Sequence, residues 1–282
     1  MITTEFLSGL DRFNLIMRKR VTSKYSGARP STVTGRGSMI KDYRIYSPGD
    51  DFRLIDWKVF ARTDNLYVKR YEEDRNLTVH VIIDSSASMN YGKPSKFDYA
   101  SMLGVGFAYI AMRGNEKFQY ATFADSVKIV PPKRGMSQMA NMVDHLNGTK
   151  ATGKSDFAEA MAIYRKAIGT RSVIIVISDF LFDPENVKKG LSELGRKHDV
   201  KLIQILDPSE RKLNLEGDVK LKDAETNELV RTYISSKLKS DYQRKLEAHM
   251  EELEKLGIAS HSTFHVVTTD TSVFDAFYEI LM

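Results

Sequence analysis

The pattern of hydrophobic and polar residues along the chain changes at Leu77. From there on, uninterrupted apolar runs alternate with segments whose apolar residues recur at helical spacing. Continuous apolar runs are typical of strands that helices cover on both faces, because both sides of such a strand are buried. The runs that predict strands are TVHVIID, KFQYATF, SVIIVISD, VKLIQILD and FHVVTT.

Helical patterns lie between these runs, at residues 95–112, 136–146, 156–168, 184–198 and 236–256. Strand–helix alternation predicts a doubly wound α/β fold, in which helices flank a mostly parallel sheet. Alternating arms on either side of ETNE predict a β-hairpin insertion near residues 218–233. The helix over 236–256 has one apolar stripe, which indicates an amphipathic helix over the sheet or, alternatively, an oligomer or partner helix.

The first 76 residues have a different texture, with few signals of buried strands. Apolar spacing predicts a helix over 3–19, and residues 40–46 resemble a strand that ends at the turn SPGDD. A short helix and a second strand follow, separated by TDN. We therefore expect a small N-terminal α+β region, residues 1–76, packed on a main domain of residues 77–282.

Composition narrows the function classes. The chain has 282 residues, 42% of them hydrophobic and 28% charged, which suits a folded protein with one large domain. It has no cysteine, so disulfides and thiolate metal sites are excluded. No apolar run is long enough to span a bilayer, and the N-terminus lacks the order of a signal peptide, so we expect a cytoplasmic protein.

The positive charge is unevenly placed. The net charge is +5, and residues 18–41 contain no acidic residue. This segment is either a solvated loop or a surface for an anionic partner. We do not expect nucleic acid to be that partner, because the sequence has no DNA- or RNA-binding motif.

Oxygen-bearing side chains follow the ends of the predicted strands. Asp84, Ser86 and Ser88 follow the first strand, Ser155 lies in a loop just before a helix, and Asp179 ends the most apolar strand. In an open α/β sheet, sites form beyond the carboxyl ends of the strands. Two carboxylates and several hydroxyls are hard ligands, which favour Mg²⁺ or another divalent cation such as Mn²⁺ or Ca²⁺.

Alternative roles for these residues have less support in the sequence. The Gly-Lys-Ser at 153–155 lacks the upstream glycine of a phosphate loop. A phosphatase that uses an aspartate nucleophile normally has a second aspartate two residues later, where this chain has Ser86. A serine nucleophile lacks a nearby histidine and the G-x-S-x-G pattern. Helix capping also accounts for an isolated match of this kind.

Two stretches resemble known families. DSSAS matches the DxSxS motif of the metal-ion-dependent adhesion site in von Willebrand factor A domains, Ser155 falls where that family has a threonine, and Asp179 falls where it has its last aspartate. DYRIYSPGDDFRLIDWKVFARTDNLYVKRYEED, followed by DSSASM, resembles the family called domain of unknown function 58. The resemblance implies a metal-binding interaction module without established catalysis, often encoded beside MoxR-type AAA+ ATPases.

We therefore expect a non-enzymatic, Mg²⁺-dependent protein-interaction module, an adaptor for a MoxR-type AAA+ ATPase. Ser86, Ser88 and Ser155 would ligate the ion, Asp84 and Asp179 would balance its charge, and a partner's Glu or Asp would fill an open position. The alternative is a metal-dependent phosphohydrolase that uses Asp84. A degenerate site that no longer holds metal is a further possibility.

The N-terminal region contains a second candidate surface. Charges of both signs alternate beside aromatic residues there, and they are Arg44, Asp50, Asp51, Arg53 and Asp56. They form either an ion-paired brace against the main domain or a partner-binding surface. Trp57, the only tryptophan, is expected to be buried in packing.

Overall fold

The computed structural model describes residues 2–3, 5–13, 34–72, 78–169, 171–213, 215, 217–222 and 229–281. The chain divides into two compact units. The larger unit consists of Met1–Leu15 and Leu77–Met282, and the smaller unit of Ile16–Asn76. The first 15 residues therefore belong with the larger unit, whereas the sequence pattern grouped them with the N-terminal region.

A six-stranded sheet forms the centre of the larger unit, with the strand order β10-β7-β6-β3-β4-β5. Five strands are parallel, and β5 pairs with β4 in the antiparallel direction. This confirms the expected doubly wound, mostly parallel α/β fold. The strands are β3 (Thr78–Asp84), β4 (Lys117–Phe123), β5 (Val127–Lys133), β6 (Ser172–Ser178), β7 (Asp199–Leu206) and β10 (Ser262–Thr268).

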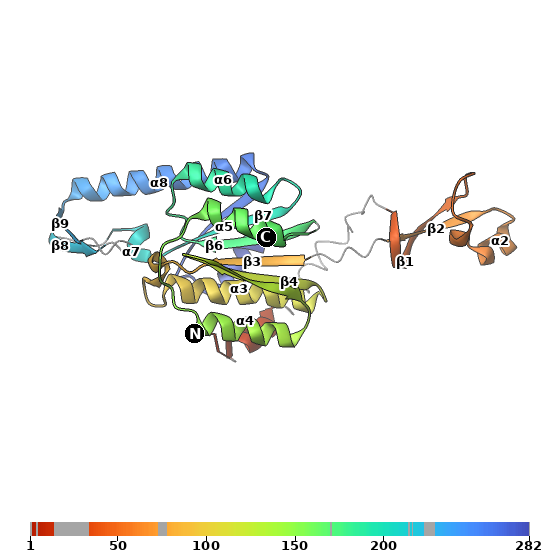
Figure 1. Ribbon diagram of the computed structural model, residues 1–282, viewed down its shortest axis with the longest axis horizontal. Coiled ribbons are helices and arrows are strands. Elements are labelled where there is room, and N and C mark those ends of the chain that lie inside the picture. Colours follow the sequence, from red (N-terminus) through yellow and green to blue (C-terminus); the bar gives the residue numbers. More distant parts are fainter. Residues whose placement is uncertain are drawn as a thin grey trace. The chain divides into compact units, whose positions relative to one another are not determined.

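Helices cover both faces of this sheet (Figure 1). α5 (Phe157–Tyr164), α6 (Pro184–Leu194) and α8 (Ser236–Ala259) lie on one face. α3 (Lys96–Arg113) and α4 (Met136–Gly148) lie on the other. These helices bury both faces of the sheet. Because successive strand residues point to opposite faces, each strand reads as a continuous apolar run.

The core is accordingly split into two layers by the sheet. Val81 and Ile83 of β3 belong to one cluster, together with residues of α3, α4 and α9 (Val273–Leu281). Ile82, between them in sequence, belongs to the other cluster with α5 and α6. The helical residues 5–13 add Leu10 to the first cluster, which accounts for the place of the N-terminus in the larger unit.

Several elements of the larger unit were not predicted. β5 contains two consecutive prolines, which are tolerated there because it is an edge strand. The short helix α7 (Pro208–Arg211) and α9 were also missed. The predicted hairpin is present as β8 (Gly217–Lys222) and β9 (Leu229–Ile234), and its turn lies outside the described residues.

The smaller unit is built on the antiparallel pair β1 (Thr34–Ile45) and β2 (Tyr67–Glu72). Between these strands lie the 3-10 turn η1 (Phe52–Leu54) and the helix α2 (Trp57–Thr63). Asp64 ends α2 in the left-handed conformation, which places the predicted TDN turn where the sequence indicated. Most of the basic segment 18–41 and residues 14–19 of the predicted first helix lie outside the described residues.

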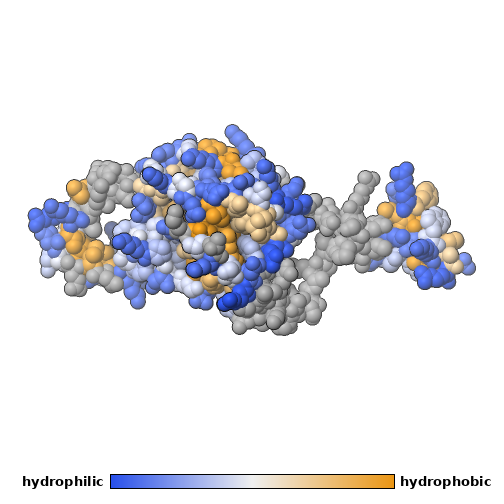
Figure 2. All heavy atoms as spheres, turned by 90° about the horizontal axis from the view of Figure 1, so that it is seen from below, coloured by the Kyte–Doolittle hydropathy of each residue, from blue (hydrophilic) through white to orange (hydrophobic). Residues whose placement is uncertain are grey.

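The prediction of a buried Trp57 is wrong, because its side chain is 60% exposed. α2 has only two turns and buries none of its residues, so it has no inner face into which a tryptophan could pack. Ile45 and Phe52 are each 66% exposed as well. Figure 2 shows the resulting mixture of hydrophobic and hydrophilic surface on this unit.

Among the described residues, no helix combines the length and the apolar character that crossing a membrane requires.

Candidate functional site

The order of the strands creates a crevice beside the end of β3. After β3 the chain builds β4 and β5 on one side, then returns to the other side of β3 to build β6 and β7. Helices leave neighbouring strands in opposite directions at such a switch point, and ligands bind there in open α/β sheets. Asp84 is the last residue of β3, and Asp179 directly follows β6.

The loop after β3 folds back on its own carboxylate. Asp84 is fully buried. Its Oδ1 accepts a hydrogen bond from the backbone N–H of Ser86 at 2.9 Å, and its Oδ2 accepts one from the Ser178 hydroxyl at 2.7 Å. The hydroxyls of Ser86 and Ser88 are 3.1 Å apart and share one hydrogen bond. The sequence motif thus becomes a compact turn with its hydroxyls on one side of a buried carboxylate.

Backbone hydrogen bonds bring the second loop against this turn. The N–H of Thr152 donates to the carbonyl of Ser85, and the N–H of Ala87 donates to the carbonyl of Gly153, both at 2.9 Å. Gly153 has φ +84°, and a Cβ there would lie 2.1 Å from the Asp125 carboxylate, so only glycine fits. This places Ser155 two residues beyond the contact.

Ser155 presents a buried hydroxyl group. It is only 8% exposed, and its hydroxyl has no hydrogen-bond partner among the described residues. An unpaired buried hydroxyl costs free energy, and native proteins rarely leave one without a reason. The hydroxyl therefore marks a place where a further polar group would find an unused donor and acceptor.

Asp179 is held by an ammonium group that the sequence did not reveal. Lys96 is fully buried, and its Nζ lies 2.9 Å from Asp179 Oδ2 and 2.7 Å from Glu210 Oε1. Burial alone would lower the pKa of Lys96, but the two carboxylates outweigh it and raise that pKa. Lys96 is therefore a charged ammonium in the interior.

The two aspartates influence each other electrostatically. Burial, and after it the negative charge of Asp179, raise the pKa of Asp84 to about 7, against the lowering effect of its hydrogen bonds. A positive charge close to Asp84 would lower the pKa of that carboxyl group again. Lys96 already places one positive charge on Asp179.

The fit of a divalent cation rests on these donors. The candidate residues are two carboxylates and three serine hydroxyls, one of which is buried without a partner among the described residues, and hard oxygens of this kind suit Mg²⁺. Within the described residues, no group of three or more His, Asp or Glu side chains could hold a metal, so hydroxyls would have to complete the ligand set. Lys96 already neutralises part of the Asp179 charge.

The charged residues predicted as a second candidate surface lie in the smaller unit, where they make local contacts. Arg44 pairs with Asp50 at 2.6 Å, and Asp51 accepts from the N–H of Arg53 as the cap of η1. Asp56 caps α2 by accepting from the N–H groups of residues 58 and 59. Tyr43 and Lys69 also contact the Asp56 carboxylate, at 3.1 and 3.3 Å.

Sequence reasoning missed Lys96, Ser178 and Glu210. Lysine near the start of a helix is usually solvated, so Lys96 attracted no attention. A signal was present, because Tyr99 and Leu103 follow it at helical spacing and all three are buried. Glu210 could not be found from spacing, since it lies far away in sequence, after β7.

Together the sheet order, the flanking helices and the DxSxS turn at the end of the central strand define a von Willebrand A-like domain. The chain belongs to the family described as "Protein of unknown function DUF58", whose model matches residues 42–252.

Two uncharacterized bacterial proteins are among the relatives of this chain. Rv1480 of Mycobacterium tuberculosis is 28% identical over 255 residues, covering 88% of this chain and 80% of the relative. YeaD of Bacillus subtilis is 25% identical over 137 residues, covering 48% of this chain and 32% of the relative.

Two solved structures are also similar. The conserved hypothetical protein BatB from Bacteroides thetaiotaomicron has a TM-score of 0.47 and 17% identity, covering 73% of this chain and 97% of that one. The SpRpn10 VWA domain has a TM-score of 0.46 and 12% identity, covering 72% of this chain and 94% of that one.

Proposed function

We propose that this chain is a non-enzymatic protein-interaction module that binds its partner through a divalent cation, Mg²⁺ in the first place. One observation supports the proposal most strongly. The loop that carries Ser155 and the end of β6 are both hydrogen-bonded to the turn after β3, and the buried Ser155 hydroxyl lacks a partner in the described part of the chain.

In this proposal Ser86, Ser88 and Ser155 hold the cation, and Asp84 and Asp179 balance its charge. A bound Mg²⁺ would supply an open coordination position for a carboxylate oxygen from the partner. The protein's own contribution is to keep the hydroxyls on one side of Asp84 and to exclude water from the carboxylate behind them. The partner would offer a Glu or Asp side chain.

The resemblance of the 42–74 stretch suggests a partner class, the MoxR-type AAA+ ATPases. The test is retention of such an ATPase on the immobilised full chain in Mg²⁺ and in EDTA. Retention in Mg²⁺ that EDTA abolishes is expected. Asp84→Asn removes the buried negative charge and should lose retention, whereas Asp218→Asn, which changes an exposed pair on the hairpin, should keep it. Equal retention by both variants contradicts the proposal.

The alternative, a phosphohydrolase with Asp84 as nucleophile, meets a specific obstacle. Both carboxylate oxygens of Asp84 accept hydrogen bonds, and the side chain is fully buried. A nucleophile needs a free oxygen within reach of the phosphorus atom. Turnover of a phosphomonoester panel that disappears in Asp84→Asn would favour the enzyme instead.

A further inference from the structure

An ion triad around a buried lysine shares one residue with the candidate metal site. Lys96, at the first position of α3, is fully buried and contacts Asp179 on one side and Glu210 on the other, at 2.9 and 2.7 Å. Burying an ammonium is costly unless carboxylates pair with it. Because Asp179 is also a member of the candidate site, one carboxylate belongs to both arrangements.

Glu210 is held firmly in its place on α7. Its Oε2 accepts the backbone N–H of Asp207 at 2.8 Å, which completes a capping box. The Tyr242 hydroxyl from α8 donates to the Glu210 carbonyl at 2.7 Å. Glu210 therefore cannot easily follow the Lys96 ammonium if that group moves.

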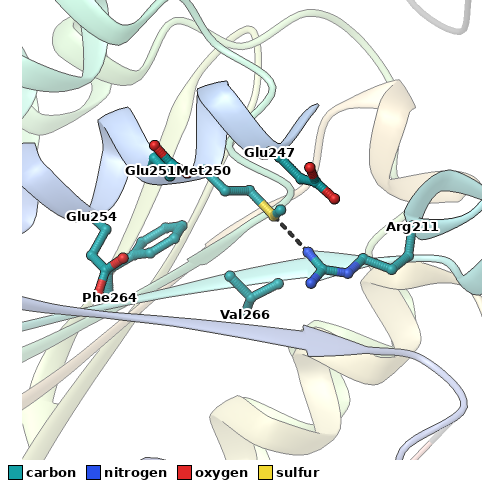
Figure 3. Close-up of a pocket in the computed structure, with 7 residues that line it drawn as sticks. All are labelled: Arg211, Glu247, Met250, Glu251, Glu254, Phe264 and Val266. Atoms are coloured by element: carbon teal, nitrogen blue, oxygen red, sulfur yellow. Dashed lines mark hydrogen bonds between the residues drawn. The ribbon is translucent and has the colours of Figure 1, made fainter. Parts of the chain in front are cut away.

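The next residue fixes α7 from the other direction. Arg211 extends into a pocket of about 350 Å³ between α8 and β10, where its Nη1 contacts the Met250 sulfur at 2.8 Å (Figure 3). α7 is thus attached to α8 through the backbone carbonyl of Glu210 and the side chain of Arg211. The carboxylate that partners Lys96 has a fixed position at the rim of the crevice.

We propose that Lys96 is an internal competitor for the divalent cation, and that the Lys96–Glu210 pair sets how tightly the crevice holds that cation. This inference rests on the proposed function. Lys96 is a tuning residue and not a metal ligand. Two positive charges that share Asp179 repel each other, so the ion binds only as tightly as the ammonium permits.

The charges around the crevice explain the direction of the effect. Lys96 and Glu210 cancel each other, which leaves Asp84 and Asp179 to balance the two charges of the ion. Removing the ammonium adds a net negative charge near the site, and removing the Glu210 charge adds a net positive one. The two substitutions should therefore change cation affinity in opposite directions.

The experiment is a Mg²⁺ titration of the full chain by calorimetry, repeated with Mn²⁺. Lys96→Met should tighten binding by about tenfold and Glu210→Gln should weaken it by about tenfold, since each changes the site by one nearby charge. The double variant should return close to the original affinity. Lys188→Met, which removes an exposed lysine paired with Glu185, is the matched control and should change nothing.

Thermal unfolding of each variant without metal separates loss of fold from loss of binding. If Lys96→Met does not fold, Glu210→Gln still tests the inference, because glutamine has nearly the same shape as glutamate. If the original chain binds Mg²⁺ and both variants leave its affinity unchanged, or shift it in the same direction, the inference is overturned while the proposed function stands. Binding by Lys96→Met alone supports the inference and contradicts metal dependence of the unmodified chain. Absence of binding in every protein overturns both.

Discussion

The two ends of the central strand carry buried polar clusters with opposite characters. Near the start of β3, His80 contacts the Tyr164 hydroxyl through Nδ1 at 2.8 Å and the Ser172 hydroxyl through Nε2 at 3.2 Å. At the far end, Asp84 lies near a second buried carboxylate and Ser155 has no partner among the described residues. Each polar group of the first cluster has a partner, whereas the second cluster includes a hydroxyl without one among the described residues.

This difference separates structural polar groups from candidate functional ones. His80 and Asp84 are both buried on the same strand, so burial alone does not distinguish the two clusters. A satisfied network fixes the packing of its elements, here β3, β6 and α5. An unpaired hydroxyl beside interacting carboxylates instead retains a cost that a ligand can remove.

The largest expected effect on stability comes from the satisfied end. His80→Leu leaves the Tyr164 and Ser172 hydroxyls without this buried partner, and we expect it to lower the free energy of unfolding by about 2–3 kcal/mol. Urea unfolding measures the change. Tyr164→Phe, which removes only one of the two hydrogen bonds, should cost less. A loss below about 0.5 kcal/mol for His80→Leu would remove the contrast between the two ends.

The same histidine predicts a pH dependence. Burial, and then the neighbouring His198, lower the pKa of His80 from 6.5 to about 4. Between these values the unfolded chain binds a proton that the folded chain does not. The contribution of neutral His80 to the free energy of unfolding is therefore complete above pH 6.5, and it is lost as the pH falls toward 4.

From pH 7 to pH 5 we expect this histidine to account for a loss of about 1–2 kcal/mol in the free energy of unfolding. Urea unfolding at the two pH values measures it. The His80→Leu protein should lose correspondingly less over the same interval. Equal losses in both proteins would show that His80 does not titrate as its burial implies.

The sequence predicted the sheet better than it predicted the site. Runs such as TVHVIID are typical of strands covered on both faces, and β3 confirms this prediction. β5 was missed because its two prolines resemble a turn, although an edge strand tolerates them. The candidate oxygen ligands were predicted from the strand ends, but Lys96 and Glu210 were not, because their meeting depends on a tertiary contact between residues 114 positions apart.

Trp57 illustrates the opposite failure. A large aromatic side chain predicts burial only if the surrounding element has a core to fill. In the described part of the smaller unit, the buried apolar residues are Ile55 and Val68. The charges there behave as caps and local ion pairs, which spacing in the sequence could have suggested.

A smaller effect tests whether those charges are structural. Asp56 caps α2, and its carboxylate also accepts a hydrogen bond from Tyr43 and pairs with Lys69. Asp56→Ala should therefore accelerate amide hydrogen exchange in α2 about fivefold. Arg44→Ala breaks only an exposed pair and should change the exchange by less than about twofold. The reverse order would show that Asp56 is free to serve a partner surface.

The smallest expected effect on stability belongs to Ser155→Ala, because that hydroxyl makes no hydrogen bond within the described residues. Its matched control is Ser101→Ala on α3, which removes another buried hydroxyl without a partner there. Both variants should unfold within about 0.5 kcal/mol of the original chain.

Mg²⁺ affinity measured by calorimetry on these two variants is the most direct test of a cation site at the carboxyl ends of β3 and β6. We predict that Ser155→Ala weakens Mg²⁺ binding by on the order of 100-fold, whereas Ser101→Ala binds as the original chain does. Equal Mg²⁺ affinity in Ser155→Ala, Ser101→Ala and the original chain would contradict the site.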